Sequence, residues 1–144
     1  MDKVFPDKWV RKALYDALNN IVVEGSPIQV FDVRVTGPSI PLDYIVMSTQ
    51  TNTVDKDNKC EWFWNHTTLL DVATTFKLPG NPGSRLEVDE IMDSVRAIIN
   101  TLTLDVASGL SIITKTQSYP NDITTVTKNE IVSRKFLRLE LLIK

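Results

Sequence analysis

The stretch SRLEVDEIMDSVRAIINTL, residues 84–102, predicts a long amphipathic helix. Its apolar side chains recur at spacings of three and four residues, which places them on one face of a helix. Ser84 and Glu87 have the spacing of a capping box, and acidic residues in the first turns suit the positive end of the helix dipole. The helix needs an apolar surface to lie on, and the segments around it have the character of strands. The apolar stripe comprises Val88, Ile91, Met92, Val95, Ile98, Ile99 and Leu102.

A second helix is predicted near the N-terminus. Pro6 and Asp7 open it, with Asp7 as the expected N-cap, and Gly25 and Pro27 end the segment. One face is apolar, so this helix should also lie against the core. That face comprises Val10, Ala13, Leu14, Ala17, Leu18 and Ile21.

Five segments are predicted as strands, at about residues 28–35, 44–51, 60–77, 110–116 and 126–143. In the first, strict alternation favours Phe31, Val33 and Val35 as the core-facing set. The second is apolar on both sides, which indicates an interior strand. Residues 52–59 are polar and predict a mobile loop or hairpin tip.

The last predicted strand separates its residues by type. Arg134, Phe136, Arg138, Glu140 and Leu142 fall on one side, and aliphatic residues fill most of the other. Strands grouped around two helices, without a βαβ repeat, predict an α+β fold. We expect an antiparallel or mixed sheet of about four to five strands packed with two main helices, in a single domain over residues 1–144.

Composition excludes several classes of protein. The chain has 144 residues, of which 42% are hydrophobic and 24% charged, as in an ordinary globular domain. A net charge of −2 gives no general attraction to nucleic acid or to anionic membranes. The single Cys60 excludes an internal disulfide, and no apolar run has the length of a membrane span or a signal peptide. We expect a soluble product made in the cytosol.

The residue patterns do not predict a catalytic or metal site. Asp55 and Asp57 begin like a calcium loop, but Lys59 stands at a ligand position and the required glycine is missing. Cys60 and His66 could supply two zinc ligands or a nucleophile and base, yet no second Cys or His completes a zinc site. There is no phosphate-binding loop and no GxSxG or HExxH motif. We expect a structural role for both residues, no metal and no cofactor.

Surplus apolar and basic side chains point instead to a contact with another protein. The run Trp62, Phe63 and Trp64 places aromatic rings on both sides of its strand, and Phe136 and Leu142 lie among polar residues. Such outward apolar residues suggest a partner surface. The alternative is a sheet covered on both faces by the two helices.

The order of segments resembles a known family. A helix KALYDALNN is followed by the strands QVFDVRV and DYIVMSTQT, then by the helix VDEIMDSVRAIINTL and C-terminal strands. This is similar to the tail-terminator or tail-completion proteins of tailed bacteriophages, and it covers the chain from about Lys12 onward. VFD at residues 30–32 and DYIVM at residues 43–47 resemble that family's VYD and PYIV segments. The polar insertion at residues 52–65 departs from the pattern.

The resemblance implies a non-enzymatic virion protein, assembled in the host cytoplasm, that forms a ring, commonly of six subunits. The ring would end tail-tube assembly and join the tail to the neck. Its implied partners are other copies of the chain, the tail tube protein and a neck or connector protein, with no sequence-specific nucleic acid and no membrane. Another head–tail connector role and a small hydrolase using Cys60 and His66 are the alternatives. The expected contact residues are Asp55, Lys56, Asp57 and Asn58 in the loop and Trp62, Trp64, Arg134 and Arg138 on strands.

Overall fold

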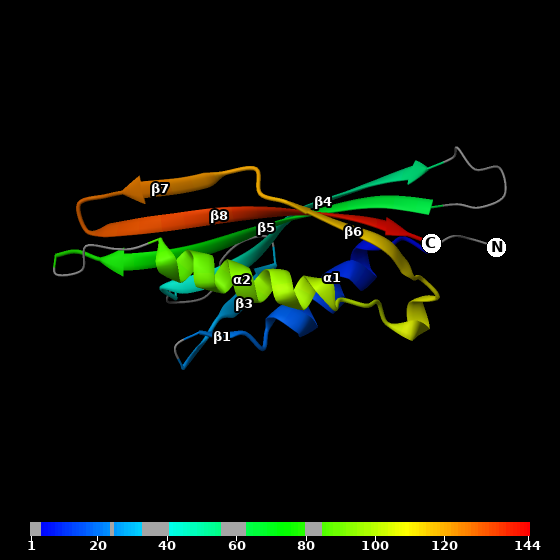
Figure 1. The fold of residues 1–144 in the computed structure, drawn as a ribbon, viewed down its shortest axis with the longest axis horizontal. Coiled ribbons are helices and arrows are strands. Elements are labelled where there is room, and N and C mark those ends of the chain that lie inside the picture. Colours follow the sequence, from blue (N-terminus) through cyan, green and yellow to red (C-terminus); the bar gives the residue numbers. More distant parts are fainter. Residues whose placement is uncertain (1–3, 24, 33–40, 56–62, 80–84) are drawn as a thin grey trace.

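The computed structural model describes residues 4–23, 25–32, 41–55, 63–79 and 85–144, and its main feature is a large β-sheet with two α-helices (Figure 1). This is the α+β class that the sequence predicts. The elements in chain order are α1 (Asp7–Leu18), β1 (Val22–Val23), β2 (Ser26–Pro27), β3 (Gln29–Asp32), β4 (Asp43–Asp55), β5 (Phe63–Lys77), α2 (Leu86–Asn100), the short 3₁₀ helix η1 (Val106–Ser108), β6 (Ile112–Ser118), β7 (Asp122–Val126) and β8 (Glu130–Ile143).

The large sheet is mixed and has six strands in the order β3-β4-β5-β8-β6, with β7 also paired to β8. β3 and β4 are parallel, and the remaining pairs of this sheet are antiparallel. Since β5 occupies one side of β8, β6 and β7 both lie along the other side, where they pair with residues 138–143 and 131–135. β1 and β2 form a separate two-stranded ribbon.

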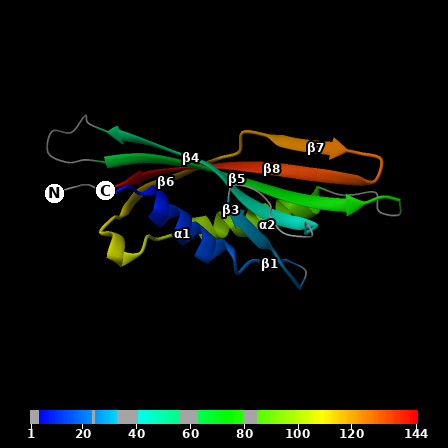
Figure 2. The same cartoon turned by 180° about the vertical axis from the view of Figure 1, so that it is seen from behind.

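Both helices lie on the same side of the large sheet, as the two opposite views show (Figures 1 and 2). The core lies between these layers. The predicted apolar stripe of α2 is confirmed, with Ile98 only partly buried, and so is the apolar face of α1. The fully buried side chains of this core include Leu14 and Leu18 from α1, Ile91 and Ile99 from α2, and Ile45, Leu70, Leu137, Leu139, Leu141 and Ile143 from the sheet.

The alternation of β8 is also confirmed. Leu137, Leu139 and Leu141 are buried beneath the helices, whereas Arg138 and Glu140 are exposed on the opposite face. The interior position of β4 is confirmed over residues 44–47, which have β3 on one side and β5 on the other. Beyond these residues β4 is longer than predicted, because residues 52–55 continue the strand and do not form a loop.

The core face of β3 was predicted wrongly. Val30 is buried in the core, and Phe31 lies on the other face of the sheet, where its ring meets that of Tyr44 edge-on. The reason is the pairing with β4, which sets Val30 beside the buried Ile45. Residues at the same level of neighbouring strands share a face, so the partner strand decided the side. Val33 and Val35 lie outside the described residues.

The start of α1 also differs from the prediction. Pro6 precedes α1, and Asp7 is its first residue, so Asp7 is not the N-cap; its carboxylate reaches across to the sheet. α2 begins at Leu86, and Arg85 before it makes no side-chain capping bond. Ser84, and with it the predicted capping box, lies outside the described residues.

The predicted strand at residues 126–143 begins later, as β8, and residues 122–126 form a separate strand, β7, that was not predicted. β7 ends at Val126, and β8 begins at Glu130. Between them the Thr127 N–H donates to the Glu130 carbonyl at 2.9 Å, and the Thr127 hydroxyl accepts from the Glu130 N–H at 3.2 Å. Side-chain bonds of this kind favour a turn over a continuous strand.

Candidate functional site

The face of the large sheet opposite the helices is the first candidate contact surface. No helix of the described ranges covers it (Figures 1 and 2), so the alternative of a sheet covered on both faces by α1 and α2 is wrong. We call it the open face. At its β3 end lies a small apolar cluster formed by Phe31, Tyr44, Val46, Ala73 and Val132.

A partly buried ion pair lies beside this cluster. Arg134 on β8 donates from Nη1 to Oδ2 of Asp71 on β5 at 2.6 Å, and from Nη2 to the Tyr44 hydroxyl at 3.2 Å. Burial raises the pKa of the Asp71 carboxyl above its ordinary value, and the Arg134 guanidinium offsets only part of this rise. The pair crosses between neighbouring strands and holds the open face together at its middle.

The other end of the open face is polar and rich in threonine. Thr51 and Thr53 on β4 and Thr114 and Thr116 on β6 project there, at the two sides of a four-stranded stretch. A shallow depression of about 460 Å³ runs over this region between β5, β8 and β6. The depression is lined by Asn65, His66, Thr67, Thr114, Thr116, Glu140, Leu141 and Leu142.

The same end of the sheet has two free strand edges. Residues 50–55 of β4 pair with β5 on one side, and within the described ranges no strand pairs with them on the other. β6 pairs with β8 and likewise has no second strand beside it in the described part of the chain. A free edge presents backbone N–H and C=O groups that can pair with another chain.

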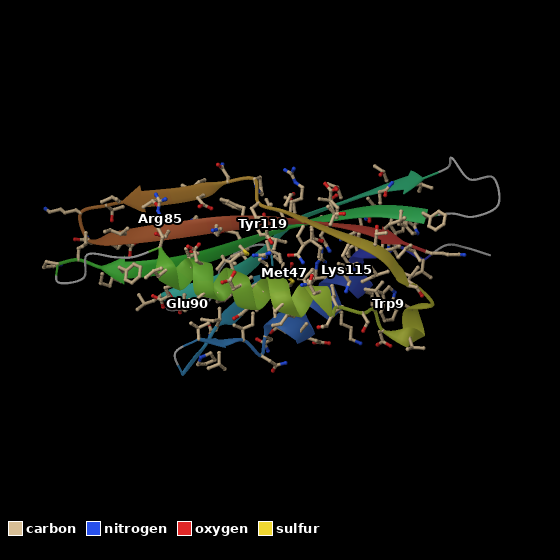
Figure 3. All side chains as sticks on the ribbon, in the orientation of Figure 1. Trp9, Met47, Arg85, Glu90, Lys115 and Tyr119 are labelled. Carbon is tan, nitrogen blue, oxygen red and sulfur yellow. The ribbon has the colours of Figure 1, made fainter. Side chains whose placement is uncertain are left out.

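The edge of β6 is tied to the end of α2. Lys115 donates from Nζ to the carbonyl oxygen of Asn100, the last residue of α2, at 3.0 Å, and Gln117 donates from Nε2 to Asn100 Oδ1 at 3.0 Å. Figure 3 labels Lys115 beside that end of the helix. The amino group therefore serves one of the unpaired carbonyls of the helix terminus.

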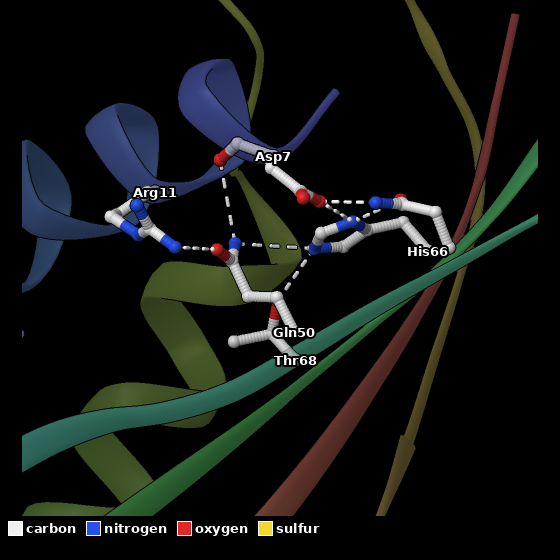
Figure 4. Close-up of polar contacts among 6 residues, drawn as sticks. Asp7, Arg11, Gln50, His66 and Thr68 are labelled. Carbon is white, nitrogen blue, oxygen red and sulfur yellow. Dashed lines mark hydrogen bonds and ion pairs between the residues drawn. The ribbon is translucent and has the colours of Figure 1, made fainter. Parts of the chain in front are cut away.

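A polar cluster fixes α1 on the sheet (Figure 4). His66 on β5 is 1% exposed, and its Nδ1 lies 2.7 Å from Asn52 Oδ1 while its Nε2 lies 2.7 Å from Thr68 Oγ1. Asn52 donates its amide to the Asp7 carboxylate, so its oxygen is left to accept from the histidine. The partners therefore assign the proton of the neutral ring to Nδ1.

The cluster resembles an acid, an imidazole and a hydroxyl in line, but it is closed to substrate. Asp7 Oδ1 lies 3.3 Å from His66 Nδ1, yet His66 and Thr68 are each 1% exposed. Burial lowers the pKa of His66 below 6.5, with the Asp7 carboxylate opposing this and Arg11 adding to it. We interpret the contact as a polar anchor between a neutral ring and a carboxylate.

The predicted contact residues do not come together as one site. Asp55 is the last residue of β4, whereas Lys56, Asp57, Asn58 and Trp62 lie outside the described residues, as do Lys59 and Cys60. Trp64 does not face outward as expected: it is 7% exposed in the core and its ring lies 5.0 Å from that of Phe5.

Four of the predicted outward residues do lie on the open face. Arg138 is exposed there, and Phe136 and Leu142 are half-buried on the same side of β8. Arg134 also belongs to this face, but its guanidinium is engaged with Asp71. The predicted residues that the structure places on the open face therefore all come from β8.

Sequence reasoning missed the free edges and the threonine pairs. The alternation Thr51-Asn52-Thr53 and Thr114-Lys115-Thr116 was visible in the sequence as two short β-favouring segments. Edge position, however, depends on which strands pair, and that is a property of the fold.

Within the described ranges, no group of three or more His, Cys, Asp or Glu side chains is placed to hold a metal ion. Over the same residues, none of the helices has the length and apolar character needed to cross a membrane. No protein-family model matches the chain, and no curated protein matches it.

Proposed function

We propose that the chain is a structural, non-enzymatic protein of a phage tail that assembles with copies of itself into a ring. The ring would sit at the head-proximal end of the tail, end the growth of the tail tube and join the tail to the neck. The order of the helices and strands along the chain supports this, because it is the order on which the resemblance to tail-terminator proteins rests.

The observation that carries the proposal is the pair of free edges at one end of the large sheet. They are formed by different strands, β4 and β6, so a contact between them is heterologous. Heterologous contacts between identical chains close into rings when each step is a suitable rotation. The open face beside these edges supplies a further surface for the tube or the neck.

The resemblance indicates a ring of six subunits, and the virion is the proposed location of the protein. A head–tail connector at another level of the neck would use the same surfaces. The position of the protein in the particle distinguishes the two roles, since a terminator contacts the last ring of the tail tube directly.

The test has two measurements on the purified full chain. Native mass spectrometry and electron micrographs should show closed rings, alone or in the presence of tail tubes. Added to tube protein from the same genome during polymerisation, the chain should cap tube ends and shorten the tubes. A chain that remains monomeric in both conditions and leaves the length of the tubes unchanged would contradict the proposal.

A further inference from the structure

The four strands at the threonine-rich end of the sheet alternate strictly in direction. β4 is antiparallel to β5, β5 to β8, and β8 to β6. The two free edges, residues 50–55 of β4 and all of β6, therefore run in opposite directions. When copies are arranged around an axis roughly along the strands, each strand keeps its direction, so β6 of one copy faces β4 of the next in antiparallel orientation.

We propose that β6 of one copy hydrogen-bonds to residues 50–55 of β4 in the next copy, so that the sheet continues from subunit to subunit. This rests on the proposed function, whose ring it makes specific. The occupant of each edge is a second copy of this chain, because the two edges complement each other in direction, face and residue type.

Residues that lie side by side on the four strands form rows across the sheet, and two of these rows begin and end with threonine. Thr51 lies beside Thr67, which lies beside Glu140, which lies beside Thr116. In the same way, the row of Thr53 leads through Asn65 and Leu142 to Thr114. If the next copy continues these rows at the same level, Thr51 meets Thr116 and Thr53 meets Thr114.

Threonine pairs across neighbouring strands stabilise a sheet, and both pairs fall on the open face. A shift of the pairing by two residues keeps every side chain on its face, whereas a shift by one would turn the threonines toward the helices. The proposal therefore allows the level register and registers displaced from it by two.

The features that normally protect an edge from pairing are few here. Neither β6 nor residues 50–55 of β4 contains proline. The one lysine of β6, Lys115, is turned toward the end of α2 and not along the edge. At the register shift of β6 beside β8, Ile113 is 49% exposed, an apolar side chain that a neighbouring strand would cover.

Contacts within the chain hold side chains of both edge strands in place before any partner binds. On the helix-facing side of β4, Gln50 donates to the Asp7 carbonyl at 3.4 Å and Asn52 donates to the Asp7 carboxylate. On β6, Lys115 and Gln117 are held by Asn100. The backbone of each edge and the threonine side chains remain available to a partner. Because the strands are already ordered, pairing costs less conformational entropy than it would for strands without these contacts.

Cysteine cross-linking tests the proposal in a Cys60→Ser background, which removes the only native thiol. The Thr51→Cys, Thr116→Cys double variant should give a ladder of disulfide-linked multimers on oxidation, which collapses on reduction. Within one copy these positions are separated by three strand spacings, roughly 14 Å, too far for a disulfide. Each link must therefore join two copies.

Mixing the two single variants should give linked dimers and nothing larger, since each copy then carries one thiol. The Thr51→Cys, Thr114→Cys and the Thr53→Cys, Thr116→Cys variants report the registers displaced by two in either direction. A ladder from any of the three double variants supports the proposal. Dimers from one single variant alone would reveal a symmetric contact and overturn it. Rings that form without a cross-link in any of the three double variants would also overturn it, while leaving the proposed function intact.

Charge provides a second readout. Lysine at both Thr51 and Thr116 should raise the dissociation constant of the oligomer by about tenfold or more, because like charges meet across the interface. Thr51→Glu with Thr116→Lys should restore association. Thr125→Lys on β7, outside the proposed interface, should leave it unchanged. If all three variants associate equally well, the inference is wrong. It is also wrong if the two edges bind only a segment of another protein and not a second copy of this chain.

Discussion

The Asp7 carboxylate at the start of α1 lies 3.3 Å from the imidazole Nδ1 of His66 near the start of β5. Asn52 bridges the two groups, since it donates to Asp7 and its oxygen lies 2.7 Å from the same ring nitrogen. The contact joins a helix and a strand that are far apart in the sequence. It fixes the end of α1 beside the part of β4 that carries a free edge.

The stability of the protein should fall as the pH drops below about 6.5. Burial lowers the pKa of His66 in the folded state below its ordinary value of 6.5. Just below pH 6.5 the unfolded chain therefore binds a proton that the folded chain does not, and unfolding becomes easier. The contribution is fully present above pH 6.5 and is lost progressively toward the lower, folded-state pKa.

Urea denaturation between pH 7.5 and about 5.5 measures this, with a slope of at most about 1.4 kcal/mol per pH unit from one group. The chain has one histidine, so a proton NMR titration of its ring gives the folded pKa directly. His66→Gln should remove the pH dependence in this range. A histidine titrating at or above 6.5 in the folded protein would contradict the prediction.

Removing Arg134 should destabilise the fold by about 2–3 kcal/mol, because it leaves the Asp71 carboxylate buried without its ion pair. The side chain of Asp71 is 12% exposed and that of Arg134 35%, so the loss is smaller than for a fully buried pair. Arg134→Ala is compared with Arg138→Ala, an exposed arginine on the same face of β8.

The control substitution should change the free energy of unfolding by no more than about 0.5 kcal/mol. Replacing the pair together, as Asp71→Leu with Arg134→Met, should recover much of the loss, because no charge is then left buried alone. If Arg134→Ala and Arg138→Ala cost the same in urea denaturation, the ion pair does not hold the open face as described.

Ile91→Ala should lower the free energy of unfolding by about 2–5 kcal/mol, since it opens a cavity between α2 and the sheet. Ile91 is fully buried in the centre of the apolar stripe of α2. Val106→Ala serves as the control, because Val106 is 93% exposed. If Ile91→Ala and Val106→Ala lower the free energy of unfolding by the same amount in urea denaturation, the placement of the core is contradicted.

Gly109→Ala should cost about 1 kcal/mol, because Gly109 ends η1 at a φ of +70°, in the left-handed region. A Cβ there would meet no atom within 4 Å, so the cost comes from the backbone alone. Gly109→Asn should cost less, since asparagine tolerates this conformation better. Equal stability of the wild type and both variants in thermal unfolding would refute the argument.

Much of the fold could be predicted from local periodicity. The stripe from Val88 to Leu102 identified the helix that covers the sheet, and the alternation along β8 correctly separated Leu139 from Arg138. Both patterns repeat over many residues, so the signal survives errors at single positions. Short segments such as β7 lacked this length, and the polar residues 127–129 after it were included in the long predicted strand.

The candidate surface was less accessible to sequence reasoning. Trp64 has the character of an interface residue, but Phe5 covers it, and only the packing of the N-terminal segment reveals this. The aromatic composition alone does not distinguish a ring in the core from one in a contact surface, because both environments favour the same side chains.

The sequence by itself determined which segments form the helices and most of the strands, and which face of α1, α2 and β8 is buried, because side-chain periodicity is a local property. Only the tertiary structure decided that Val30 and not Phe31 enters the core, that Asp7 meets His66, and that β4 and β6 end as free edges on one sheet. Each of these depends on which strand lies beside which. That is settled by contacts between residues distant in the chain, which no local pattern records.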